Sequence, residues 1–240
     1  MKALLWEIFG IADILVEGGE IMHFQFLIED QSSAVLIEII MEKISSKNEG
    51  ITFNCKFFKG IGGFTKKNTV KETKSGKLLN DLATYLRGFN KSLQNIPAVI
   101  IVVLDNDTRN TKAFLAELTR VAQQNMIYMD HVFCIAVEEV EAWLLGDEEA
   151  VVSAYPKARL QQLHSYVQDS ICGTWEVLAD VVYPGGVSKL KKDCPTYIEK
   201  GKCKSEWARK IGAYMDITHN NSPSFNYFIA EINKRLYKVG

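Results

Sequence analysis

Acidic side chains follow three apolar segments of the sequence, at or just after the point where each segment ends. Glu29 follows FLI, Asp105 and Asp107 follow IIVVL, and Glu138, Glu139 and Glu141 follow CIAV. If the segments are parallel strands, their carboxyl ends form one edge of a sheet, where α/β proteins bind ligands. Crowded carboxylates repel each other, and a hard divalent cation with oxygen ligands relieves that repulsion. Acids of this group are therefore predicted to bind a metal ion, Mg²⁺ or Mn²⁺.

Each of these acids also has a simpler explanation, in which it serves the fold alone. Loops are polar, and an Asp or Asn after a strand often caps the next helix. The run LDND, taken alone, is more often structural than catalytic, although the spacing of Asp105 and Asp107 would aim both side chains the same way. Three acidic strand ends in one sheet favour the metal site over this simpler explanation.

Two glutamates near the N-terminus end apolar runs, Glu17 in ILVEGG and Glu29 in FLIEDQSS. Only Glu29 stands on a strand-to-helix turn, because capping residues and then apolar residues at helical spacing follow it. VEGGE is followed at once by the next strand. Residues 1–21 are predicted to be a leader, or an extension upstream of a second start at Met22, and no chemistry is assigned to them.

The elements that must position these acids alternate between strand and helix along the chain. Seven successive apolar residues from Ala98 indicate a strand that is buried on both faces, as in the centre of a parallel sheet. The alternation predicts an α/β protein with a mostly parallel sheet flanked by helices. Strands are predicted at residues 22–28, 51–58, 98–107 and 131–137, and helices at 34–44, 78–90, 111–125 and 138–147.

The rest of the chain has a different character from the strand–helix part. From about residue 148 onward the pattern is helical and irregular, so we predict an α/β domain at 22–150 and a helical C-terminal extension at 151–240 packed on it. No apolar run reaches the roughly 18 residues of a membrane span, so no membrane contact is expected. The five cysteines are odd in number and form no C-x-x-C pair, which favours a reducing, cytoplasmic compartment.

The net charge of −1 conceals two basic segments on either side of an acidic one. Residues 55–91 hold nine Lys and Arg against two acids, and residues 186–210 hold eight against three. Residues 130–150 hold seven acids and no Lys or Arg. A basic stretch is usually only a solvated face, but this arrangement fits a polyanionic substrate.

Two other phosphate motifs are excluded by single residues. TKSGKLL ends like a P-loop, yet Lys71 stands where the loop needs a glycine. LDNDTR is similar to the aspartate-nucleophile phosphatases, yet Arg109 takes the Thr or Val position and no later Gly-Asp-x-x-x-Asp follows. A small-molecule phosphatase is therefore the weakest functional hypothesis.

The acidic pattern resembles that of the Toprim fold, the metal-binding domain of topoisomerases, primases and overcoming-lysogenization-defect nucleases. FLIEDQSSAVLIE and VVLDND match that pattern through Glu29, Asp105 and Asp107, although the usual Glu-Gly is Glu-Asp here. A closer resemblance covers nearly everything after Met22. It is to small Toprim proteins encoded beside ABC-type ATPases in bacterial defence loci, through IEDQSS, LDND, AVEEVEAWLLGD and WARKIGAYMDITHNNSPSFNYF.

This resemblance implies a metal-dependent nuclease that hydrolyses DNA or RNA. In such an enzyme Glu29, Asp105 and Asp107 would be catalytic and hold one ion, and Glu139 and Glu141 would hold a second. The protein would be the effector of an antiviral, abortive-infection system, with an ABC-type, SMC-like ATPase as partner. The alternative is a non-catalytic module that binds nucleic acid or the ATPase. Whether the chain forms a homodimer is left open.

The resemblance also assigns roles to residues outside the acids. Trp143, Trp207 and Phe225 are expected to pack the C-terminal helices on the sheet. Lys204 is expected to reach a phosphate or, more simply, to be a surface lysine. Asp216, Ser222 and Ser224 fall on further signature positions. The lysines expected to contact a nucleic-acid backbone are Lys59, Lys66, Lys67, Lys189, Lys191, Lys192 and Lys204.

Overall fold

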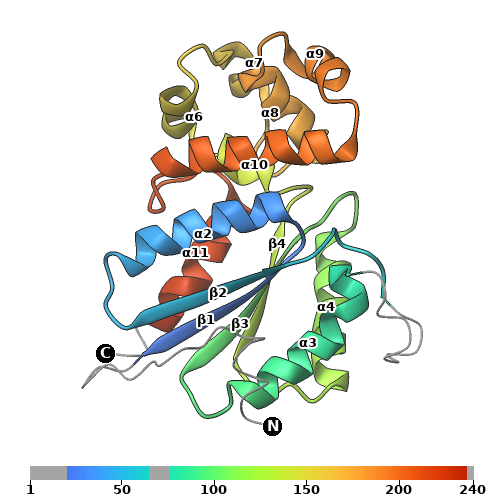
Figure 1. The fold of residues 1–240 in the computed structure, drawn as a ribbon, viewed down its shortest axis with the longest axis vertical. Coiled ribbons are helices and arrows are strands. Elements are labelled where there is room, and N and C mark those ends of the chain that lie inside the picture. Colours follow the sequence, from blue (N-terminus) through green and yellow to red (C-terminus); the bar gives the residue numbers. More distant parts are fainter. Residues whose placement is uncertain (1–20, 65–75, 237–240) are drawn as a thin grey trace.

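A four-stranded sheet with strand order β2-β1-β3-β4 forms the centre of the molecule (Figure 1). The computed structural model describes residues 21–64 and 76–236. Every strand pair is parallel, which confirms the predicted α/β class and is consistent with a Toprim-like architecture. The strands are β1 (Met22–Ile28), β2 (Ile51–Phe57), β3 (Ala98–Asp105) and β4 (His131–Ala136).

The side chains of the strands alternate between two hydrophobic cores, one on each face of the sheet. In β3, Val99, Ile101 and Val103 enter one core. Ile100 and Val102 enter the other. Because a central strand is buried on both faces, it reads as the continuous apolar run that predicted it.

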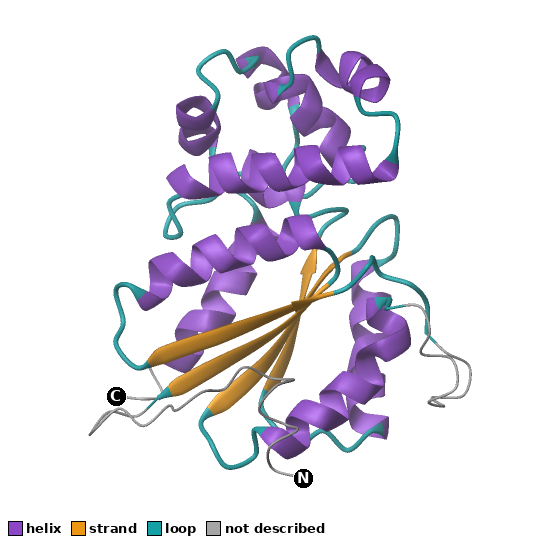
Figure 2. Ribbon diagram, in the orientation of Figure 1, coloured by secondary structure: helices purple, strands orange, loops and turns teal. Residues whose placement is uncertain are grey.

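Helices cover both faces of the sheet (Figure 2). One core includes side chains of α2 (Gln31–Ser45) and α11 (Pro223–Leu236). The other includes side chains of α3 (Leu78–Ser92) and α4 (Thr111–Gln124). Helix α2 begins directly after β1, because Asp30 caps it by accepting the Ser33 amide at 2.8 Å.

A layer of helices lies beyond the carboxyl edge of the sheet (Figure 1). Its longest helix, α10, packs along α2, and a Cβ added at Gly212 would lie 3.0 Å from Leu36 Cδ1. Lys43 of α2 fixes this contact, since its ammonium donates to three carbonyl oxygens at the end of α10 at 2.7–2.9 Å. The layer comprises α5 (Glu141–Leu145), α6 (Glu148–Ala154), α7 (Leu160–Ser165), α8 (Thr174–Val182), α9 (Gly186–Asp193) and α10 (Tyr197–Tyr214).

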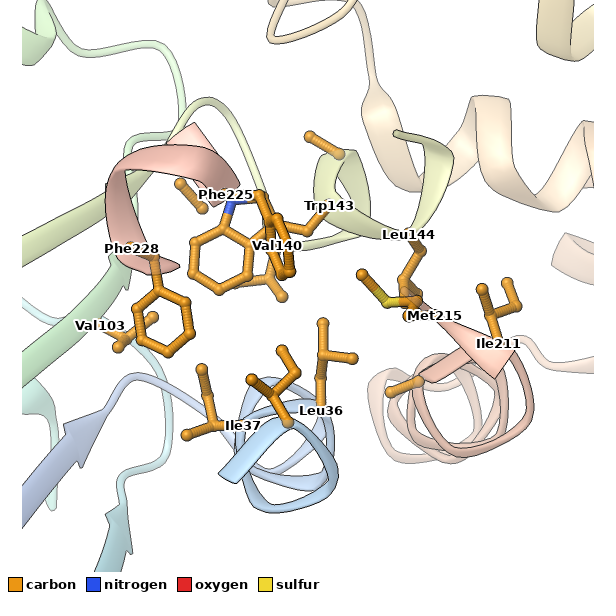
Figure 3. Close-up of a cluster of buried hydrophobic side chains, with 14 of the residues drawn as sticks. Leu36, Ile37, Val103, Val140, Trp143, Leu144, Ile211, Met215, Phe225 and Phe228 are labelled. Atoms are coloured by element: carbon orange, nitrogen blue, oxygen red, sulfur yellow. The ribbon is translucent and has the colours of Figure 1, made fainter. Parts of the chain in front are cut away.

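The last helix, α11, returns to the sheet and completes the core that Leu36 and Ile37 of α2 also line (Figure 3). Trp143 stacks on Phe228 with 5.0 Å between ring centroids, and its Nε1 donates to Ser224 Oγ at 2.9 Å. Phe225 meets the same indole edge-on, at 5.6 Å. Trp207 is 3% exposed in this core. The packing role expected of these aromatic residues is confirmed.

Several predicted boundaries differ from the structure. The third strand ends at Asp105, not 107, and β4 ends at Ala136. The next helix does not follow at once, because Glu138 has a positive φ of 61° and starts a turn. Residues 1–20 of the predicted leader, and residues 65–75 of the basic segment at 55–91, lie outside the described residues. None of the described helices is long and apolar enough to cross a membrane.

Candidate functional site

Two of the predicted acids, Glu29 and Asp105, lie side by side at the carboxyl edge of the sheet. Strands β1 and β3 are parallel neighbours in register, so the residues that end them meet. Glu29 Oε2 accepts the Asp105 amide hydrogen at 3.0 Å, and Asp105 Oδ1 accepts that of Val140 at 3.0 Å. Both side chains are buried. Two strand ends are thus joined through carboxylate–amide hydrogen bonds.

Glu139 and Glu141 reach the same edge from the turn between β4 and α5. Glu139 Oε2 accepts the Trp175 amide hydrogen at 3.0 Å, which ties this turn to the start of α8. Glu141 is only 4% exposed, as the first residue of α5. The turn therefore adds two further buried or half-buried carboxyl groups to the edge where β1 and β3 end.

Lys204 of α10 lies among these acids. Its Nζ is 3.1 Å from Glu141 Oε2 and 3.6 Å from Glu139 Oε1, and its side chain is 16% exposed. The expectation of a surface lysine is wrong, because α10 crosses above the sheet edge and turns this side chain inward. The ammonium is engaged by carboxylates, so Lys204 is also not placed as a contact for a nucleic-acid backbone.

The low exposure of the acids changes their affinity for protons. Burial raises the pKa of Glu29 to about 7 and that of Glu139 to about 8, and neighbouring carboxylates add to both shifts. Burial and the charge of Glu29 raise the pKa of Asp105 well above 3.8. Burial lowers the pKa of Lys204, but Glu141 and the other acids outweigh it and raise that pKa well above 10.5. The ammonium is therefore charged, while these acids bind protons more tightly than exposed carboxyl groups do.

Asp30, one of the capping residues predicted to follow Glu29, is a further member of this group. Its charge adds to the effect of burial in raising the pKa of Glu29, Asp105 and Glu141, so it lies close to all three. Its position directly after Glu29, on the same strand-to-helix turn, was the available signal. We call the group of Glu29, Asp30, Asp105, Glu139 and Glu141 around Lys204 the acidic site.

Asp107 lies at the rim of the acidic site and does not point with Asp105 as predicted. Its φ is +47°, its side chain is half exposed, and its carboxylate pairs with Arg109 Nη1. The i, i+2 rule fails here because β3 has already ended at Asp105. Its charge still contributes, after burial, to the raised pKa of Glu29.

The remaining signature positions stabilise loops around α11. Ser222 Oγ donates to Asp169 Oδ1 at 2.7 Å, and the Ser224 amide donates to Asp169 Oδ2 at 2.7 Å. Asp216 Oδ1 accepts the amide and hydroxyl hydrogens of Thr218. These residues hold the chain that connects α10 with α11.

The predicted nucleic-acid lysines divide into several places. Lys191 of α9 lies 5.3 Å above the Trp175 ring, whose own amide binds Glu139, so α9 flanks the acidic site. Lys189 pairs with Asp193 on the same helix, and Lys192 is exposed. Lys59, after β2, is exposed as well. Lys66 and Lys67 lie outside the described residues.

A hard divalent cation fits the donor chemistry of the acidic site. Within residues 21–64 and 76–236, neither Glu29 Oε1 nor Asp105 Oδ2 accepts a hydrogen bond, so each acid keeps one oxygen for a ligand. Carboxylate oxygens are the ligands that Mg²⁺ and Mn²⁺ prefer. In the described part of the chain no three His, Cys, Asp or Glu side chains are already arranged to hold an ion. Three acids that could complete a metal-binding group are paired with basic side chains instead: Glu139 and Glu141 with Lys204, and Asp107 with Arg109.

Comparison with known proteins gives one match. A protein-family model described as "Domain of unknown function (DUF4276)" matches residues 28–233. The match begins one residue before Glu29 and ends within α11, so it includes the whole acidic site. No curated protein and no solved structure matches the chain.

Proposed function

The chain belongs to the family DUF4276, a domain of unknown function, and on that premise we propose that it is a Mg²⁺- or Mn²⁺-dependent nuclease. One observation carries the proposal. Carboxyl groups from three separate strand ends gather, largely buried, at the carboxyl edge of a parallel sheet, with one ammonium among them. Such a group of acids favours the binding of a divalent cation. This cation and the nearby lysines would suit a phosphodiester substrate.

In this proposal Glu29 and Asp105 hold the ion through their free oxygens, and Asp107 assists from the rim. The chemistry that such an ion would supply is activation of water and neutralisation of charge on the leaving oxygen. The backbone amides of Asp105 and Val140 fix the orientation of the two carboxylates before any substrate arrives. The exposed lysines of α9 and Lys59 hold the phosphate backbone without reading its sequence.

The biological setting of this nuclease follows from the resemblance to defence-locus Toprim proteins. We place it in the cytoplasm, as the effector of an antiviral pair with an ABC-type, SMC-like ATPase. An ATPase gene beside this one would support the pairing, and co-purification of the two proteins would test it. Because such a partner can control the effector, the cleavage assay below is run with and without it.

The cleavage assay compares neutral variants of the site with a neutral variant elsewhere. Asp105→Asn keeps an acceptor for the Val140 amide, and Glu29→Gln keeps one for the Asp105 amide, so both proteins are expected to fold. Each should lower Mn²⁺-dependent cleavage of DNA or RNA by more than about 100-fold, beyond the loss typical of residues that only support a ligand. Glu117→Gln, at an exposed position of α4, is the matched control. Cleavage by Asp105→Asn at the wild-type rate would overturn the catalytic assignment.

A non-catalytic module that binds nucleic acid or a partner ATPase is the second candidate. This candidate is favoured because basic side chains of the chain already neutralise two of the acids. Lys204 pairs with Glu141, and Arg109 pairs with Asp107. Such a module would bind nucleic acid with a steep salt dependence and without turnover. Calorimetric titration with Mg²⁺ separates the candidates, since affinity weaker than millimolar favours the module.

A further inference from the structure

The acidic site has two halves, Glu29 with Asp105 and Glu139 with Glu141, and the carboxylate oxygens of the two halves have different partners. In the Glu29–Asp105 half, Glu29 Oε1 and Asp105 Oδ2 accept no hydrogen bond from the described residues. In the Glu139–Glu141 half, Lys204 Nζ stands 3.6 Å from Glu139 Oε1 and 3.1 Å from Glu141 Oε2. The remaining Glu139 oxygen accepts the Trp175 amide hydrogen. One half is open to a cation, and the other already contains one.

Lys204 is held in this position by the helix that carries it. At the start of α10, Thr196 and Glu199 form a reciprocal capping box. At its end, the Lys43 ammonium binds the carbonyl oxygens of Gly212, Ala213 and Met215. Between these ends α10 buries Trp207 and Ile211 in the core. The backbone at Lys204 therefore cannot move away to admit another ion.

A divalent ion bound by Glu139 and Glu141 would have to share their oxygens with the ammonium. Direct coordination places such an ion about 2.1 Å from a carboxylate oxygen, well within the distance at which Lys204 would repel it. This repulsion would be relieved if the Lys204 side chain, which is 16% exposed, moved out of the site. In the Glu29–Asp105 half the Lys204 charge acts on both acids, but among the described residues its ammonium pairs with neither of their carboxylates.

We propose that Lys204 is the permanent cation of the Glu139–Glu141 half, so that the chain binds one divalent ion, at Glu29 and Asp105, and not two. The proposal rests on the proposed metal-dependent function and refines the predicted pair of ions. Lys204 acts here as a positioning residue: it fixes Glu139 and Glu141, and through Glu139 the start of α8. The Lys204 ammonium then stays between Glu139 and Glu141 at any concentration of free Mg²⁺.

Calorimetric titration with Mn²⁺ tests the number of ions directly. Wild type and Lys202→Met, which removes an exposed lysine two residues away on α10, should each bind one ion per chain. Lys204→Met, which keeps the aliphatic stem, should bind two. Its melting temperature should be lower than that of wild type without metal and should rise more steeply with added Mn²⁺, because binding stabilises the folded state.

A second pair of variants keeps the test independent of how well Lys204→Met folds. Glu29→Gln should weaken the single Mn²⁺ site by at least about 10-fold, whereas Glu141→Gln should leave its affinity within about threefold. Equal weakening by both variants, or two ions bound by wild type, would overturn the one-ion proposal while leaving the nuclease proposal intact. One ion bound, without cleavage of any nucleic acid, would overturn the nuclease proposal and leave the role of Lys204 standing. No Mn²⁺ bound by wild type would overturn both.

Discussion

At the scale of single residues, Glu138 lies beside Glu139 in the turn after β4, but its role is to stabilise the fold. Its carboxylate accepts the backbone amide hydrogens of Cys172, Gly173 and Thr174, together with the Thr174 hydroxyl, and so caps α8. Burial works to raise the pKa of Glu138, but these hydrogen bonds together lower it below 4.5. The ionised carboxylate thus stabilises the fold.

We predict that Glu138→Gln lowers the free energy of unfolding by about 1 kcal/mol at neutral pH, the usual cost of a weakened helix cap. A carboxylate with a lowered folded-state pKa contributes stability above its unfolded value, 4.5, and loses it as the pH falls through the folded value. The difference from wild type should therefore shrink as the pH is lowered below about 4. Urea unfolding across this range measures it.

Glu117→Gln is again the control, because that side chain is exposed in the middle of α4. It should change the free energy of unfolding by less than about 0.5 kcal/mol at any pH in the range. A pH-independent loss in Glu138→Gln would contradict the capping role and point to a packing defect instead.

Residue-scale prediction from the sequence succeeded where strand ends decide position. Glu29 and Asp105 could be placed together because each directly follows a buried strand of one parallel sheet. Lys204 could not be placed, since nothing local shows that a lysine of α10 meets Glu139 and Glu141, more than 60 residues earlier. Asp107 was misplaced because the end of β3 was set two residues too late, beyond the point where alternation holds.

At the scale of elements, α10 carries two glycines with opposite surroundings. A Cβ added at Gly201 meets no atom within 4 Å. One added at Gly212 would lie 3.0 Å from Leu36 Cδ1 and 3.4 Å from Ile39 Cδ1, where α10 crosses α2. Replacing each glycine by alanine therefore separates two effects: Gly201→Ala measures the gain in helix propensity, and Gly212→Ala adds the cost of crowding against α2.

We predict that Gly201→Ala raises the free energy of unfolding by about 0.5–1 kcal/mol, as expected for an open helical position. Gly212→Ala should lower it, because the crowding of about 1–3 kcal/mol exceeds the same gain in propensity. Thermal and denaturant unfolding of the two single variants and the double variant provide the measurement. Stabilisation by Gly212→Ala would show that α2 and α10 can separate without loss.

The elements themselves were largely predictable, and their ends were not. Continuous apolar runs gave β1, β3 and β4, and helical spacing with capping residues gave α2 and α4. The turn at Glu138–Val140 was missed because its shape depends on the start of α8, which supplies amides to Glu138 and Glu139 from more than 30 residues away. Such a partner leaves no trace in the local pattern.

At the scale of the whole molecule, α11 joins the two ends of the described chain. Phe228 is fully buried and lies 6.3 Å from Phe26 of β1, between ring centroids. The C-terminal region, predicted as an extension, therefore contributes a helix to the main core as well as a layer beyond the sheet edge. The sequence does not reveal this return, because an amphipathic helix does not specify which sheet it covers.

We predict that Phe228→Ala lowers the free energy of unfolding by about 3–5 kcal/mol, the usual cost of emptying an aromatic core position. Tyr227→Ala, on the same helix with 45% of its surface exposed, should cost about 1 kcal/mol or less. Urea unfolding followed by near-UV circular dichroism compares them. Equal losses would mean that α11 is not part of the cooperative core.

The return of α11 sets an order of events during synthesis. Phe26 leaves the ribosome about 200 residues before Phe228, so the face of β1 under α11 stays open until α11 has been made. Contacts this distant in sequence slow folding and prolong the exposure of apolar surface. The nascent protein is therefore a natural client for chaperones until α11 has been made and can cover this face of the sheet.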